Sequence, residues 1–97
     1  MSTMEKWVRE RVDVFVRHGG KTSRRATVGR LIAILDDIQQ HEQGVRQPPQ
    51  VGRAHLHRYW VRKHRLAERT LADHWYAMRL LWQLLERSGE PPKPPLV

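Results

Sequence analysis

A chain of 97 residues has about the length of one small domain and can bury only a modest core. It has no cysteine, which excludes disulfides and cysteine-ligated zinc, and no apolar run approaches the roughly 20 residues of a membrane span. Eighteen lysines and arginines, 14 of them arginine, oppose ten acidic residues and give a net charge of +8. The guanidinium group of arginine can donate two hydrogen bonds at once to a phosphate or to the edge of a guanine. Nucleic acid is therefore the first expected partner, ahead of an acidic protein and a membrane surface.

Apolar residues recur at helical spacing and predict an all-α chain. We expect four helices, at about 3–17, 22–42, 53–64 and 67–88. Thr22 or Ser23 can cap the second helix, and Gly89 is a suitable terminator for the fourth. Residues 44–52 include two adjacent prolines and are expected to form a loop. Residues 1–90 would then be one helical domain, and the proline-rich residues 91–97 an extended linker or loose terminus outside the core.

The fourth predicted helix is apolar on two sides. Its main stripe spans about 80° and should face the core: Ala67, Leu71, Trp75, Met78, Trp82 and Leu85. A second stripe, Tyr76, Leu80 and Leu84, lies on the opposite side. A helix of this kind either occupies the centre of its bundle or docks on a partner, and the sequence leaves both possibilities open.

Charge is concentrated in two blocks. Residues 21–30 carry four basic and no acidic residues, and residues 51–65 carry five basic and none that are acidic. The second half of the second helix is acidic instead, with Asp36, Asp37 and Glu42. We expect the two basic blocks to merge into one face that binds nucleic acid. The alternative is that they are simply solvated helix surfaces.

No pattern indicates catalysis, a metal or a cofactor. His55 and His57 are two residues apart, so they point to different sides of a helix and not to one ion. The sequence has no phosphate-binding glycine loop, nucleophile elbow or metalloprotease motif. Tyr59 falls on the core side of its helix, and Tyr76 has no neighbouring base. We therefore expect a protein that is not an enzyme.

Several segments follow a recognisable order. Four residues of the second helix are spaced by four, four and three: Thr27, Leu31, Leu35 and Ile38. The third helix, Arg53–His64, has a basic end, and Ala67–Thr70, Ala77–Trp82 and Gly89–Pro92 follow. Together these segments resemble the N-terminal core-binding domain of tyrosine recombinases, the phage integrases. Two positions depart from that family: Leu31 replaces a commoner tyrosine, and Ala67 replaces the usual capping serine.

The resemblance implies a SAM-like four-helix fold that binds duplex DNA through its second and fourth helices. The family's catalytic residues belong to a second domain, so the implied role is DNA binding at the core site of a DNA integration reaction. The implied partners are duplex DNA and other recombinase protomers or a catalytic domain, in the cytoplasm of a bacterium and at its nucleoid. The DNA-binding residues implied or expected are Lys21, Thr22, Ser23, Arg24, Arg25, Arg65, Arg69, Thr70, Asp73 and His74, with Arg58 and Arg62 at the rim.

Three questions stay open at this stage. The chain could be a protein-interaction module or an accessory factor of recombination that uses Tyr76, Leu80 and Leu84. It could also be a helix-turn-helix regulator, for which the turn at 62–67 is short enough but the loop at 44–52 is too long and too rich in proline. It could be part of a longer recombinase or a protein that acts alone.

Overall fold

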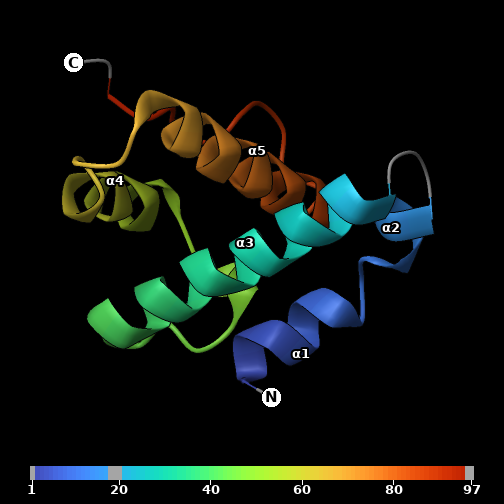
Figure 1. Ribbon diagram of the computed structural model, residues 1–97. Coiled ribbons are helices and arrows are strands. Elements are labelled where there is room, and N and C mark those ends of the chain that lie inside the picture. The colour runs from blue at the N-terminus through green and yellow to red at the C-terminus, as the bar shows by residue number, and fades with distance from the viewer. Residues whose placement is uncertain (1, 18–20, 96–97) are drawn as a thin grey trace.

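The computed structural model describes residues 2–17 and 21–95, and within them it is all-helical and without strands (Figure 1). The helices are α1 (Thr3–Arg9), α2 (Asp13–Arg17), α3 (Lys21–His41), α4 (Arg53–Arg62) and α5 (Glu68–Leu84), with a short 3-10 turn, η1 (Pro48–Gln50), before α4. The all-α prediction is confirmed. The sequence His18-Gly19-Gly20, whose glycines favour an end to the first predicted helix, lies outside the described residues. None of the helices in the described part of the chain has the length and apolar character that a membrane span requires.

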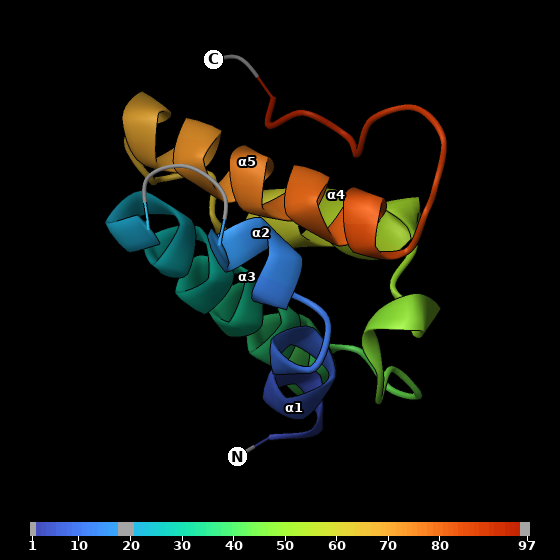
Figure 2. The same ribbon diagram turned by 90° about the vertical axis from the view of Figure 1, so that its right-hand side faces the viewer.

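The long helix α3 is central to the packing. It contacts α1, α2, α4 and α5, and α5 crosses it with the largest share of these contacts (Figures 1 and 2). Leu31, Ile34, Leu35 and Ile38 form its buried stripe, at the helical spacing that the sequence predicted. Trp60 and Trp82 are also buried, as expected. Burial of these large side chains is the main favourable contribution to the stability of so small a domain.

The first predicted helix is in fact two. Residues 3–17 break between Arg9 and Asp13, where the Arg11 N–H bonds to the Val8 carbonyl only three residues back, at 3.0 Å. A physical reason lies in the valines at alternate positions from 12 to 16, which are poor helix formers, and in Asp13, which suits a helix N-terminus. The break leaves Val12 buried in the core.

Helix α5 ends earlier than predicted. It stops at Leu84, and Glu86, not Gly89, takes the left-handed conformation that ends it, with φ 54°. The Arg87 N–H bonds to the Trp82 carbonyl at 3.0 Å, and the Glu86 N–H to the Gln83 carbonyl at 3.1 Å. These two bonds form a Schellman motif, in which glycine is the usual residue at the left-handed position. Gly89 then makes a second turn, with φ 75°.

The loop before α4 and the C-terminal tail are both packed into the fold. Val45, Pro48 and Val51 of the loop are buried, and Arg87 donates to the Val51 and Pro49 carbonyls at 2.6 and 3.0 Å. The expectation that the tail lies outside the core is wrong for Pro91 and Pro92, which are buried. The tail returns along α5 toward its N-terminal end (Figure 2).

Candidate nucleic-acid interface

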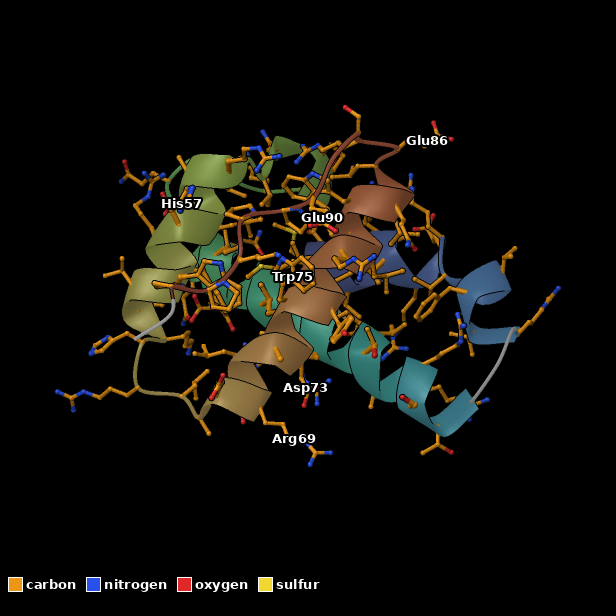
Figure 3. All side chains as sticks on the ribbon, turned by 90° about the horizontal axis from the view of Figure 1, so that it is seen from above. His57, Arg69, Asp73, Trp75, Glu86 and Glu90 are labelled. Atoms are coloured by element: carbon orange, nitrogen blue, oxygen red, sulfur yellow. The ribbon has the colours of Figure 1, made fainter. Side chains whose placement is uncertain are left out.

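The N-terminal halves of α3 and α5 lie on the same side of the molecule. Figures 2 and 3 agree on this arrangement, and in Figure 3 Arg69 and Asp73 project from this part of α5. The two helices are far apart in the sequence but pack against each other. Of the sequence-predicted residues, Ser23 and Arg24 of α3 and Asp73 of α5 line one groove, whereas Arg25 lines a separate hollow with Arg9 and Asp13.

An open groove runs between the N-terminal half of α3 and residues 73–83 of α5. Its polar lining comes from Ser23, Arg24, Thr27 and Arg30 of α3 and from Asp73, Tyr76, Arg79 and Gln83 of α5. Three guanidinium groups therefore face one carboxylate, and the groove is cationic. Arg30 and Arg79 were missed by the sequence reasoning. Arg30 closes the acid-free block 21–30, and Arg79 follows Asp73 and Tyr76 at helical spacing, so both could have been found by extending those patterns.

The arginines on this side keep their charge available. The guanidinium of Arg24 lies 4.7 Å from the ring centre of Phe15 and donates to the Phe15 carbonyl at 3.2 Å. The guanidinium of Arg79 lies 5.1 Å from the ring centre of Trp75. Contacts with rings and carbonyls orient a cation without neutralising it. Within the described residues, none of the arginines of α3 and α5 forms a salt bridge: Arg24, Arg25, Arg30, Arg69 and Arg79.

Hydroxyl and amide donors accompany these arginines. Thr22 and Ser23 are exposed at the start of α3, whereas the Thr27 hydroxyl donates to the Ser23 carbonyl at 3.1 Å and is turned to its own helix. Ala67, the N-cap of α5, supplies no side-chain hydrogen bond, so the first amides of that helix remain available to an anion. Because Ala67 stands where a capping serine is usual, the first backbone N–H groups of α5 can donate to a phosphate.

The second basic block has a different environment. Arg58 donates to both carboxylate oxygens of Glu42, at 2.6 and 3.0 Å, and Arg62 donates twice to Asp37 Oδ1, at 3.1 and 2.6 Å. Lys63 Nζ lies 3.5 Å from the other oxygen of Asp37. The hydrogen bond from Arg58 lowers the pKa of Glu42 below its usual value. The two basic blocks therefore do not form one unpaired cationic surface, contrary to expectation, and we place Arg58 and Arg62 outside the interface.

His74 is held by the core and is not turned to the surface as a charged group. Its Nδ1 lies 2.8 Å from the hydroxyl of the buried Tyr59. Burial lowers the pKa of His74, and the charges of Arg30 and Lys63 lower it further. Burial also raises the pKa of Tyr59, which keeps its proton. At neutral pH His74 thus adds a hydrogen bond between α4 and α5 and no positive charge to the proposed interface.

The second apolar stripe of α5 is not a docking surface. Leu80 is only 3% exposed, and Leu84 is half-buried against the core, so of the two possibilities that the sequence left open, the central position of the helix is the one observed. The central position of α5, between α3 and the returning tail, explains why it is apolar on two sides. Tyr76 alone is exposed, at 55%, with its ring beside Trp75 and Arg79.

The other predicted contacts are placed as follows. Arg65 and Arg69 are exposed, and Thr70 and Asp73 are half-buried. The side chain of Lys21 lies outside what the structure describes. No group of histidine and acidic side chains in residues 2–17 and 21–95 could hold a metal ion. One histidine has a structural role instead, because His55 Nδ1 accepts the Gly52 N–H at 2.9 Å at the start of α4.

Comparison with known proteins gives no match: no family model fits the sequence, no curated protein is significantly similar to it, and no solved structure is significantly similar to the fold.

Proposed function

We propose that this chain is a duplex-DNA-binding module whose interface is formed by the N-terminal half of α3 and by α5. The observation that carries the proposal is that Arg24, Arg30 and Arg79 line one groove between these helices. Arg25 and Arg69 are exposed on the same two helices, and none of the five arginines forms a salt bridge within the described residues. Exposed hydroxyls and uncapped helix amides add neutral donors. This combination suits the phosphates of a DNA backbone.

We further propose that the module has the SAM-like core-binding fold and serves a site-specific tyrosine recombinase, in which catalysis belongs to another domain. The spaced residues from Thr27 to Ile38 and the segment Ala77–Trp82 support this proposal. They lie on α3 and α5, which pack against each other. Under this proposal the module supplies affinity and orientation to the recombinase and no catalytic group.

Phosphate contacts should dominate the binding energy, so sequence preference should be weak. Arg30 and Arg79 line the groove and could reach a guanine edge, where arginine forms two hydrogen bonds. Asp73 opposes phosphates but can accept from the amino group of cytosine. Sequence preference would therefore come from a few groove residues, whereas exposed Arg25 and Arg69 would position the duplex.

The test is a fluorescence-anisotropy titration of a labelled duplex at several salt concentrations. Neutralisation of five phosphates gives a slope of log affinity against log salt of about −4.5, or a loss of about 500-fold between roughly 50 and 200 mM salt. Absence of binding near 50 mM salt would refute the proposal. Binding that does not change with salt would refute phosphate-dominated recognition and favour the protein-interaction module.

A further inference from the structure

The C-terminal tail is seated between α4 and α5 by two tryptophans. Trp60 of α4 donates its indole N–H to the Pro92 carbonyl at 2.9 Å, and Trp75 of α5 donates to the Pro91 carbonyl at 3.1 Å. Figure 3 shows the tail passing over Trp75 on its way back along α5. Two helices therefore each supply one aromatic donor to consecutive residues of the same segment.

Further contacts hold the tail on either side of this pair. The Arg53 guanidinium donates to the Glu90 carbonyl at 2.8 Å, and Lys93 Nζ lies 5.4 Å from the ring centre of Trp75. Beyond Lys93, Pro94 and Pro95 border a small apolar pocket whose other walls include Leu66 and Leu71. The contacts thus extend over the whole segment 90–95.

We propose that the seam between α4 and α5 is a binding groove for proline-rich segments in an extended, polyproline-type conformation, and that residues 90–95 are its ligand within the same chain. Proline has no N–H, so its carbonyl is the only backbone group that it can offer, and an aromatic groove with N–H donors is suited to it. A proline-rich segment is already extended and loses little entropy on docking. The cation of Lys93 over an aromatic face adds a second element of recognition.

Apolar packing alone does not account for these contacts. Packing would bury the prolines without requiring that both indoles donate to successive carbonyls. The groove therefore binds the backbone carbonyls of the segment as well as its proline rings. A second segment of the same chemistry should be able to occupy it. This inference is independent of DNA binding, because the seam shares none of the unpaired arginines of the proposed interface except Arg79, which contacts the outer face of Trp75.

The first experiment measures the mobility of the tail in the full chain. The chain has no cysteine, so Pro95→Cys, at an exposed position, gives a single site for a nitroxide spin label. In the parent the label should be largely immobilised. Trp60→Phe and Trp75→Phe keep an aromatic ring but remove the N–H donor, and each should raise the ratio of mobile to immobile label about three- to tenfold. Trp7→Phe is the matched control. Trp7 of α1 is half-buried against the core, and it makes no contact with the tail among the contacts described.

The second experiment tests recognition in trans. In full-length protein carrying Pro91→Ala and Pro92→Ala, and shown by circular dichroism to be folded, a synthetic peptide Gly-Glu-Pro-Pro-Lys-Pro-Pro should bind saturably and change tryptophan fluorescence. The same peptide with alanines at its first two prolines should not.

Either experiment can overturn the proposal. A label that is mobile in the parent, or equal mobility in the Trp60→Phe, Trp75→Phe and Trp7→Phe variants, would show that the indole donors do not hold the tail. Absence of saturable peptide binding up to millimolar concentration would show that the seam is a packing surface and not a binding groove. The spin-label result stands alone if the double alanine variant fails to fold.

Discussion

The two basic segments of this chain have similar compositions and opposite electrostatic environments. Residues 21–30 at the start of α3 hold arginines without a salt bridge in the described structure, whereas Arg58, Arg62 and Lys63 contact Asp37 and Glu42. Asp37 lies in the C-terminal half of α3, and Glu42 directly follows the last residue of that helix. The two ends of α3 therefore act differently: its start carries cations that are unpaired among the described residues, and its end supplies the acids that pair with cations of the second block.

This difference shows that a count of charges along the sequence does not locate a binding face. The pairs at Asp37 and Glu42 leave both carboxylates largely covered, at 17% and 13% exposure. Pairing removes Arg58, Arg62 and Lys63 from the cations that can attract DNA over distance. The arginines of α3 and α5 form no such pair within the described residues.

The largest expected effect is on DNA affinity. Arg25→Gln with Arg69→Gln removes two phosphate contacts, so affinity at about 50 mM salt should fall tenfold or more and the salt slope should flatten by about two units. Arg58→Gln with Arg62→Gln makes the same change in net charge and should alter affinity by less than about threefold. Anisotropy titrations of the two double variants measure both values. Equal losses would remove the distinction between the regions.

The second effect is on stability. Asp37→Asn removes the charge that Arg62 and Lys63 share, and it should cost about 1–3 kcal/mol because the pair with Arg62 is mostly buried. Asp36→Asn is the matched control: Asp36 accepts a hydrogen bond from the Ser2 hydroxyl at 2.9 Å and has no arginine partner among the described residues. Denaturant unfolding compares the two variants, and equal destabilisation would contradict this assignment.

The third effect is on the pH dependence of stability. The folded chain lowers the pKa of His74 below 6.5, mainly through burial. The unfolded chain therefore binds a proton more readily, so this contribution to stability is complete above about pH 6.5 and is lost as the pH falls through the lowered pKa. Melting temperatures measured from pH 8 to pH 5 should show the loss. It should disappear in His74→Gln and persist in His57→Gln, an exposed control; persistence in both variants would assign the loss to another group.

The smallest effect concerns the pair of Glu42 with Arg58, whose arginine side chain is exposed. Since the pKa of Glu42 is lowered from 4.5, the stabilising pair is complete above that pH and is lost as the pH falls through the lowered value. Glu42→Gln should therefore change the melting temperature little at neutral pH and reduce its decline in acid. A large change at neutral pH would mean that this pair contributes more than exposed pairs usually do.

The sequence predicted the parts of the fold that depend on local pattern. The apolar stripe of α3 and the burial of Trp60 and Trp82 follow from helical periodicity, and the stop of α4 near the turn at 62–67 was close to the observed end. Periodicity could not show the break at Val12, because a kinked and a straight helix share one apolar pattern. Periodicity also could not show that α5 would end at a left-handed Glu86, three residues before the glycine that is the more usual residue for this conformation.

The parts of the site that depend on tertiary pairing could not be read from the sequence. Asp37 and Arg62 are 25 residues apart, and only the packing of α4 on the acidic half of α3 brings them together. The docking of Pro91 and Pro92 depends on two indoles from different helices, so a proline-rich composition alone indicated a loose tail. The sequence could not show whether Leu80 is exposed or buried, because a pattern of apolar residues does not show how many neighbouring segments cover α5.

The most direct test of the contrast between the two regions is a ¹⁵N spectrum of the arginine Nε–H groups during titration with duplex DNA. We predict that the Arg25 and Arg69 signals shift and broaden with added duplex, while those of Arg58 and Arg62 stay near their starting positions because Glu42 and Asp37 already hold their Nε–H groups. Shifts confined to Arg58 and Arg62, with Arg25 and Arg69 unchanged, would contradict the proposed interface.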